Sequence, residues 1–390
     1  MVSASLERQH PSAVPGRANR TDSSGTVFAA VDRRDLESAI ALAEWDDLAR
    51  DTGEPNPFYE HWSLLPALDA FGERAACTLM VLRCEGRLCG LIPLARAAGY
   101  YGYPLPHLAN WSHDNLFVGN PLVRRGYEER FWRELLDHAD AAPGGALFLH
   151  LDRLAEDGPL FAALARIVGE QGRAWAVVQR EERAMLQSDL SPQAYFERAL
   201  NGKKRKELRR QDKRLADEGT RGFERRDDEA GLDRWIEQFL ALEKAGWKGR
   251  NGSALADDPR TRGWFVQTMR GAAAHGRLER LSLTLDGAPI AMLANFIAPP
   301  GAFSFKTAYD ERFARYSPGV LLQRENLDLL TRDGIAWCDS CAAADHPMIE
   351  RIWREKRAMV RVNLAIGGKL RRTVFRQVLR AELARQSRSR

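Results

Sequence analysis

The sequence predicts an α/β protein built from two copies of one unit. Each half holds a pair of apolar segments joined by a short turn, as in a β-hairpin, at Cys77–Leu94 and at Leu281–Phe296. A helical stretch precedes each pair, and a late helix follows it, at Tyr127–Ala139 and at Val320–Arg332. Because this pattern recurs after about 200 residues, too long a period for a solenoid, we expect two domains with mixed central sheets flanked by helices.

Composition and charge are those of an ordinary globular protein. Of 390 residues, 44% are hydrophobic and 28% are charged, and 58 basic against 53 acidic residues leave a net charge of only +5. No apolar run approaches the roughly 18 residues of a membrane-spanning helix. The N-terminus lacks the apolar core of a signal peptide, and five cysteines argue against a disulfide framework. We therefore expect a cytoplasmic protein.

Local composition divides the chain into five expected segments. They are a disordered leader (1–25), an N-terminal domain (26–190), a basic helical linker (191–225), a C-terminal domain (226–370) and a basic C-terminal helix (371–390). The last segment carries Val374, Phe375 and Leu379 on one face. This face favours docking on the protein body over weak contact with a membrane surface.

The stretch Ala302–Leu330 predicts a strand, a turn and a helix that suit a phosphate group. From Phe303 to Ala308, side chains of two kinds alternate with the period of a strand. In the turn that follows, Ser317 is a good N-cap and Pro318 suits the first helical turn. Unpaired first-turn amides, the helix dipole and the small Gly319 then favour an anion. Many such turns bind nothing, so the motif is a hypothesis.

Three segments carry a resemblance to a known family. FKTAYDERFARYSPGVLL (Phe305–Leu322), GWKGRNGSAL (Gly246–Leu255) and KKRKELRRQDKRLADEG (Lys203–Gly219) resemble the CelD/BcsL family of GNAT-type acyltransferases. That family is associated with cellulose and exopolysaccharide functions and is related to the Fem-type aminoacyltransferases. The resemblance covers roughly Asn56–Leu330. It implies tandem GNAT-like domains and a C-terminal acyl-CoA site.

The resemblance also implies a cosubstrate, acetyl-CoA, and the residues that would hold it. In GNAT folds the pyrophosphate lies on the turn after the fourth strand, and amides of that strand pair with the pantetheine. Carried over to this chain, the cofactor-binding residues are Phe305, Lys306, Arg315, Ser317, Gly319 and Val320. Acyl transfer would then join an acetyl group to an amine or hydroxyl of a sugar or cell-envelope precursor.

Acyl transfer needs a base for the acceptor's proton and an acid for the leaving thiolate. We expect Asp310 and Glu243 as candidate bases. GNAT enzymes often place a tyrosine on a late helix, but the helix expected over Pro347–Met359 offers only Trp353. Tyr309 is therefore the candidate acid.

Two loops are candidates for acceptor binding. In Gly246–Gly252, three glycines accompany Trp247, Lys248 and Arg250, a composition that suits a lid or substrate loop and also occurs in ordinary exposed loops. In the first half, an aromatic loop carries His113 and Asp114. That loop favours either substrate contact or packing at a domain interface.

The basic segment Lys203–Arg214 has eight cations in twelve residues. It predicts either a solvated helix between domains or a basic wall for an anionic ligand, such as a nucleotide-sugar, a polyprenyl-phosphate sugar or tRNA. The segment lacks interleaved aromatic residues, so we expect no DNA partner.

A metal site is not expected. Cys338 and Cys341 form a C-x-x-C pair with His346 nearby, but a structural zinc site needs four ligands. On the predicted strand, a spacing of three also sends the two thiols to opposite faces.

Three functional hypotheses follow. The first is an acetyl-CoA-dependent acyltransferase with a small-molecule or saccharide acceptor. The second is a Fem-like aminoacyltransferase that uses charged tRNA, and the third is a non-catalytic accessory protein of polysaccharide biosynthesis. CoA binding separates the first from the third, and ribonuclease sensitivity identifies the second.

Overall fold

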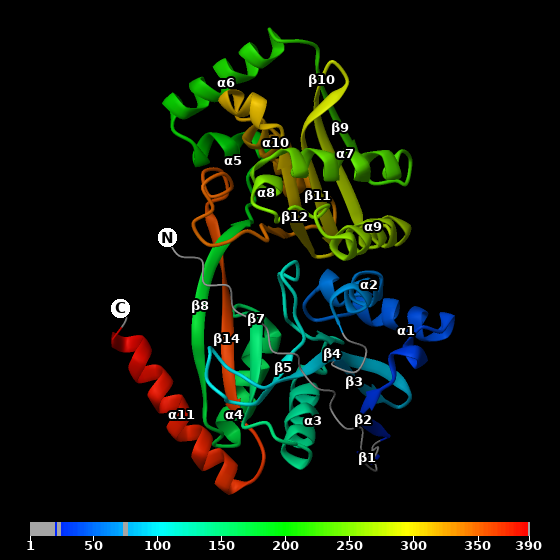
Figure 1. Cartoon of the computed structure of the whole chain (residues 1–390), viewed down its shortest axis with the longest axis vertical. Coiled ribbons are helices and arrows are strands. Elements are labelled where there is room, and N and C mark those ends of the chain that lie inside the picture. Colours follow the sequence, from blue (N-terminus) through cyan, green and yellow to red (C-terminus); the bar gives the residue numbers. More distant parts are fainter. Residues whose placement is uncertain (1–19, 22–24, 73–76, 389–390) are drawn as a thin grey trace. The chain divides into compact units, whose positions relative to one another are not determined.

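A computed structural model describes residues 20–21, 25–72 and 77–388 (Figure 1). The predicted leader over 1–25 lies outside these residues except for Arg20–Thr21 and Gly25. The chain forms two compact units. The first comprises residues 1–61, 71–181 and 358–390, and the second comprises 62–70 and 182–357. The chain passes from one unit to the other within strands β8 (Trp175–Leu186) and β14 (Glu355–Ala365).

The first unit contains a mixed sheet with the strand order β1-β2-β3-β4-β5-β7-β14-β8. Neighbours from β2 to β5 are antiparallel, β5 and β7 are parallel, and the short β6 pairs with β4. The strands that complete this sheet are β1 (Arg20–Thr21), β2 (Thr26–Val31), β3 (Cys77–Cys84), β4 (Arg87–Ala97), β5 (His107–Asn110), β6 (Leu122–Val123) and β7 (Phe148–Ala155).

Helices of the first unit are amphipathic and bury one face. The helices are α1 (Ala39–Arg50), α2 (His61–Phe71), which passes into the second unit, α3 (Glu128–Ala141), α4 (Pro159–Glu170) and α11 (Lys369–Arg388). In α3, Phe131, Trp132 and Leu135 recur at helical spacing and are fully buried. The indole Nε1 of Trp132 donates a hydrogen bond to Leu160 O of α4 at 2.9 Å. This contact joins the two helices on one core.

The second unit has the strand order β8-β13-β12-β11-β10-β9. Neighbours from β9 to β12 are antiparallel, and β12 and β13 are parallel. Its further elements are α5 (Pro192–Ala199), α6 (Gly202–Ala216), β9 (Arg221–Arg226), α7 (Leu232–Ala245), α8 (Trp247–Arg250), α9 (Pro259–Ala274), β10 (Leu278–Leu285), β11 (Ala288–Ala298), β12 (Gly301–Tyr309), α10 (Pro318–Glu325) and β13 (Trp337–Asp339).

Side-chain alternation on β10 places helices on both faces of the second sheet. Leu281 and Leu283 pack with Leu321 and Leu322 of α10 in one core cluster. Ser282, which points to the other face, accepts a hydrogen bond from the Trp235 indole of α7 at 2.9 Å. The sheet is therefore a central layer between α10 and α7, as Figure 1 shows.

The two units repeat one topology. Each has a strand followed by two or more helices, then three antiparallel strands, then a helix and a strand parallel to the last of the three. The expectation of an α/β protein with mixed sheets flanked by helices, built from two copies of one unit, is thus confirmed. No helix in the described residues is long and apolar enough to cross a membrane.

Two local predictions are wrong. The expected helix over Pro347–Met359 is a series of turns that leads into β14 at Glu355. Met359 and Val360 pair with β7 there, and these inter-strand hydrogen bonds override the local helical spacing. The loop expected after Gly246 instead begins with the helical turn α8. Other elements, including α6, α7 and β12, have the predicted type and place.

Candidate functional site

Strand β12 contains a β-bulge at Phe305. On the β11 side, Asn295 pairs with Ser304 while the neighbouring Ala294 pairs with Lys306, so Phe305 is the extra residue. On the β13 side, parallel pairing covers only Gly301 to Phe303. Beyond Phe303, that edge of β12 has no strand partner in the described chain. A bulge re-aims the local backbone, so the amides after Phe305 have a free edge at which a ligand could pair.

The Phe305 side chain is held from several directions. It lies 3% exposed and stacks on Phe296 at a centroid distance of 4.4 Å. Phe265 of α9 lies 6.4 Å away, and the Lys306 ammonium lies 5.6 Å from the Phe305 ring. This aromatic packing gives the bulge a fixed position in the sheet.

After β12 the chain makes a 3-10 helix (Glu311–Tyr316) and enters α10. Ser317 has a left-handed backbone conformation, with φ at 55°, and its side chain makes no capping hydrogen bond. Its carbonyl oxygen instead accepts from Val320 N at 2.9 Å and Leu321 N at 3.0 Å. The prediction of Ser317 as a side-chain cap is therefore wrong, because a left-handed residue directs its side chain away from the first turn. Pro318 occupies the first helical turn, as expected.

Gly319 lies where any side chain would meet a neighbour. A Cβ atom at this position would be 2.7 Å from Met348 Sδ and 3.5 Å from Cδ1 of Tyr309. Residues 347 and 348 come from the turns that replace the expected helix. Tyr309 and Met348 therefore flank the predicted phosphate turn, which the sequence alone did not indicate.

The helical turn α8 is tied to two carboxylates. Lys248 Nζ donates to Glu243 Oε1 at 2.6 Å, and Leu255 N donates to Glu243 Oε2 at 2.8 Å. Glu311 accepts from Trp247 N at 2.7 Å and from Arg250 at 2.6 Å. Through Glu311, the structure joins the predicted acceptor loop to the end of β12. Glu311 lies directly beside the predicted Asp310, and sequence reasoning missed it.

The other predicted charges on this turn already have partners. Asp310 accepts from Arg312 Nε at 3.0 Å and from its terminal nitrogen at 2.6 Å. These hydrogen bonds hold the pKa of Asp310 below its ordinary value, against the opposing effect of its burial. Arg315 pairs with Glu218 at 2.9 Å and lies 4.7 Å from the Tyr316 ring. A carboxylate with a lowered pKa is a weak base, so Asp310 is less suited to proton transfer than its position suggested.

His346 is a second functional candidate that the sequence did not single out for catalysis. Its half-buried imidazole is close enough to Lys248 and Glu350 for both charges to affect it. Burial, the main cause, lowers the pKa of His346, and Lys248 adds to this effect while Glu350 opposes it. The ring is therefore neutral at pH 7, the form that can accept a proton. Only its tertiary neighbours make His346 a candidate.

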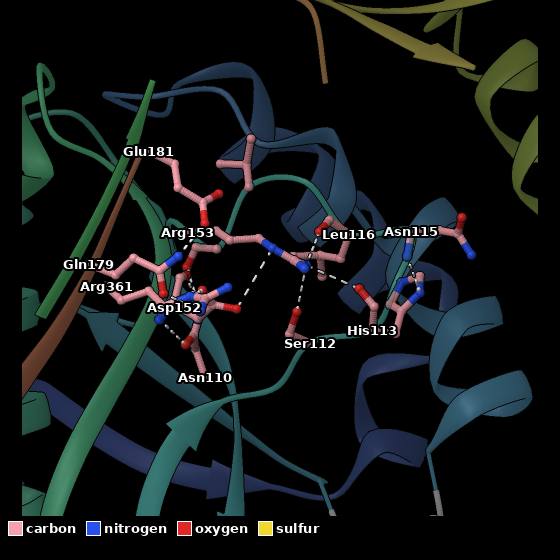
Figure 2. Close-up of polar contacts among 12 residues, drawn as sticks. Asn110, Ser112, His113, Asn115, Leu116, Asp152, Arg153, Gln179, Glu181 and Arg361 are labelled. Atoms are coloured by element: carbon pink, nitrogen blue, oxygen red, sulfur yellow. Dashed lines mark hydrogen bonds and ion pairs between the residues drawn. The ribbon is translucent and has the colours of Figure 1, made fainter. Parts of the chain in front are cut away.

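The remaining predicted acceptor residues, His113 and Asp114, belong to the first unit (Figure 2). The His113 ring stacks on Phe71 with a centroid distance of 4.7 Å, and Asp114 is exposed. Arg153 fastens this loop: its guanidinium donates to Ser112 Oγ at 3.0 Å and to His113 O at 3.2 Å. In Figure 2 the Arg153 side chain extends from β7 toward the loop. Arg153 thus holds the loop through a hydroxyl and a main-chain contact.

The first unit differs from the second at the end of its parallel strand pair. Pairing of β5 with β7 ends at Ala109 and His150. Beyond this point the Asn110 side chain connects the two strands. Its Nδ2 donates to Asp152 O at 3.0 Å and to Gly119 O at 3.1 Å, and its Oδ1 accepts from Asp152 N at 2.8 Å. The β4–β5 ladder has no bulge. In the first unit, Asn110 therefore occupies the position equivalent to the one that has no strand partner beside β12.

Comparison with protein families supports an acyltransferase-type domain in the second unit. Residues 202–357 match the family model described as an acetyltransferase (GNAT) domain. This match covers β9 to β13, α10 and the predicted phosphate turn. No curated protein matches the sequence significantly.

Solved structures with the same fold cover most of the chain. FemX aligns at 11% identity with a TM-score of 0.55, over 84% of this chain and 96% of FemX. A conserved protein of unknown function from Bacteroides thetaiotaomicron aligns at 14% identity and 0.53, over 84% of this chain and 98% of that one. The C-terminal domain of a putative lysylphosphatidylglycerol synthetase from Agrobacterium fabrum aligns at 13% and 0.51, over 83% and 91%. At these identities the likeness concerns the fold alone.

Proposed function

We propose that the protein is an acyltransferase that uses acetyl-CoA, with its site in the second unit. The observation that carries the proposal is the bulge at Phe305 beside the open edge of β12, followed by the turn into α10. All of it lies within the segment that matches the acetyltransferase family. The residues fit the group: backbone donors lie along one edge, and a helix N-terminus lies at its end. We further propose that the protein acts in the cytoplasm.

Each end of the cosubstrate has residues suited to it. When bound, acetyl-CoA supplies the thioester that is attacked. The backbone from Phe305 to Ala308 would pair with the pantetheine arm, with Lys306 beside it. The first-turn amide of Gly319, together with Ser317 and the Arg315 guanidinium, would hold the pyrophosphate. Val320, whose N–H already donates to Ser317 O, would only line the turn. The Met348 side chain would have to move from Gly319, which a flexible thioether can do at low cost.

The acceptor would lie against α8, where Trp247, Lys248 and Arg250 offer an indole and two cations. Glu243 holds Lys248 in place, and both carboxylate oxygens of Glu243 accept hydrogen bonds. We therefore assign Glu243 a positioning role and His346 the removal of the acceptor's proton. Tyr309 remains the proposed acid for the thiolate. An anionic sugar or cell-envelope precursor suits these cations, and the resemblance to the CelD/BcsL family suggests that class.

The test is the melting temperature of the full chain against rising acetyl-CoA, with free CoA alongside. At a hundred times its dissociation constant, a ligand of the native state stabilises by about 2.7 kcal/mol. We expect a saturating rise that Gly319→Glu abolishes, because the new carboxylate repels the pyrophosphate. Gly263→Glu is the matched control: the position is helical, and nothing lies within 4 Å of an added Cβ.

A second variant keeps the proposal testable if the first one fails to fold. If Gly319→Glu fails to fold because of Met348, then Arg315→Glu reverses a charge that is 67% exposed and should weaken CoA binding with the fold intact. No rise in the wild type at millimolar acetyl-CoA would overturn the proposal. It would leave the Fem-like tRNA-dependent transfer and the non-catalytic accessory role in polysaccharide biosynthesis.

A Fem-like transfer from charged tRNA is a second candidate, favoured by the surface of α6. Seven cations of this helix are exposed. Arg210 pairs with Glu207 at 2.7 Å, and the other six form no ion pair within the described residues: Lys203, Lys204, Lys206, Arg209, Lys213 and Arg214. Such a cationic face suits a polyanion. Product formation that depends on aminoacyl-tRNA and is lost after ribonuclease treatment would support this candidate, and persistence after treatment would exclude it.

A further inference from the structure

A polar cavity of about 340 Å³ lies beside the N-terminal half of α7. From Gly231 to Glu243 the axis of α7 advances about 18 Å, at 1.5 Å per residue, so this cavity is separate from the site proposed above. Its walls come from β9, β10, β11 and α7, within the second unit. Its polar lining comprises three arginines and one carboxylate, Arg226, Arg234, Arg280 and Glu224, together with Gln238, Ser282 and Thr284.

Arg280 is the central observation. Its side chain lines the cavity but is only 2% exposed. One terminal nitrogen donates to Asp228 O at 2.7 Å, to Ala230 O at 3.0 Å and to Asp228 Oδ1 at 3.2 Å. Its Nε is buried and has no hydrogen-bond partner in the described part of the chain. A buried guanidinium with an unused donor is costly unless a further acceptor is present.

Arg280 also shares its neighbouring carboxylates, Asp228 and Glu224, with a second arginine, Arg226. Arg226 donates to Asp228 at 2.9 and 2.7 Å. Burial, the largest cause, lowers the pKa of Arg280, and Arg226 adds to the lowering, while Asp228 and Glu224 oppose it. Burial and Arg226 both disfavour the isolated cation. An anion in the cavity would relieve them.

The helix α7 adds a second set of donors. Its N-cap, Gly231, has φ at 67° and no side chain to cap the first turn. The first N–H groups of this 14-residue helix have no intrahelical partner and carry partial positive charge, although Leu232 N already donates to Glu229 O at 3.1 Å. In the same wall, Ser282 Oγ accepts from the Trp235 indole at 2.9 Å, which leaves the hydroxyl proton of Ser282 for another acceptor.

We propose that this cavity binds the phosphoryl group of a small phosphate monoester. Guanidinium forks, hydroxyl groups and a helix N-terminus are the donors that recognise phosphate oxygens. The volume lies at the lower end of ligand pockets, about 300–1,000 Å³, and so exceeds what a phosphoryl group alone requires. Arg234, which is exposed and forms no ion pair within the described residues, would close over the anion at the rim.

The experiment is titration calorimetry of the full chain with glucose 6-phosphate and with inorganic phosphate, at constant ionic strength. We expect saturable binding that is tighter for the sugar phosphate. Arg234→Gln should raise the dissociation constant about tenfold, the loss of one charge-assisted hydrogen bond. Thr284→Val, nearly the same shape, should raise it about threefold by removing one hydroxyl donor.

Two controls locate the ligand. Arg260→Gln changes a guanidinium on α9 that is 74% exposed, and it should leave the dissociation constant unchanged. Gly319→Glu should also leave it unchanged, because that turn lies elsewhere. The proposal is overturned if binding does not saturate, if Arg234→Gln binds like the wild type, or if Gly319→Glu abolishes binding. Equal affinity for both probes would overturn the monoester and identify a free-phosphate site.

Discussion

His107 shows how the environment of one residue sets a measurable property. The side chain is 5% exposed, its ring stacks on Phe148 at 4.9 Å, and its Nδ1 lies 3.0 Å from Leu105 O. Burial, the main cause, lowers the pKa of His107 to about 4, although the hydrogen bond to Leu105 opposes it. The folded protein therefore keeps this imidazole neutral. Burial also lowers the pKa values of His138 and His150 in the same unit.

These values predict a loss of stability on mild acidification. His107 binds a proton near pH 6.5 in the unfolded chain but only near pH 4 in the folded one. The stability that neutral His107 contributes is therefore complete above pH 6.5 and is lost as the pH falls toward 4. For His107 the loss at pH 5 is about 2 kcal/mol. We expect the urea midpoint to fall less between pH 7.5 and pH 5 in His107→Gln than in the wild type. His275→Gln, at an exposed histidine, should keep the full dependence, and an equally steep fall in His107→Gln would contradict the assignment.

At the scale of elements, the four-residue turn α8 depends on contacts made outside it. A single helical turn is unstable by itself, because nucleation costs more than one hydrogen bond returns. Glu311 and Glu243 hold this turn through Trp247 N, Arg250 and Lys248. These contacts explain why the segment forms a helical turn, where the sequence predicted a loop. The same contacts fix its two cations beside the end of β12.

Weakening one contact should open the turn without unfolding the protein. In Glu311→Gln the charge-assisted bonds to Trp247 N and Arg250 are lost, so we expect trypsin to cleave after Lys248 or Arg250 about threefold faster. The melting temperature should change little, since the Glu311–Arg250 pair lies at the surface. Glu170→Gln, at an exposed carboxylate that also binds two arginines, is the matched control. Unchanged cleavage would show that Glu311 does not hold α8.

For the whole molecule, two units of one topology differ at the end of the parallel strand pair. The second unit has the bulge at Phe305 and an open edge beyond Phe303. The first has no bulge in β5, and Asn110 occupies the end of the parallel pair with hydrogen bonds to Asp152 and Gly119. Repeating the fold has therefore not repeated the bulge or the open strand edge.

This difference predicts one acetyl-CoA per chain. Titration calorimetry should give a stoichiometry near one for the wild type, none for Gly319→Glu, and still one for Asn110→Ala, because the first unit lacks the bulge. Asn110→Ala should also destabilise the protein, by about 2–3 kcal/mol, since it leaves buried backbone groups unpaired. Two sites per chain, or a second site created by Asn110→Ala, would refute the assignment.

The sequence by itself determined the alternation of strands and helices, the repeat, and the helices α6 and α7, because local spacing and turn residues encode these features. It also indicated the strand and turn around Gly319. Only the tertiary structure decided that Phe305 is a bulge, since register depends on pairing with β11. It also decided that Glu311 anchors α8, that Met348 covers Gly319 and that Arg280 lines a cavity. Each of these joins segments distant in the chain, and no local pattern carries that information.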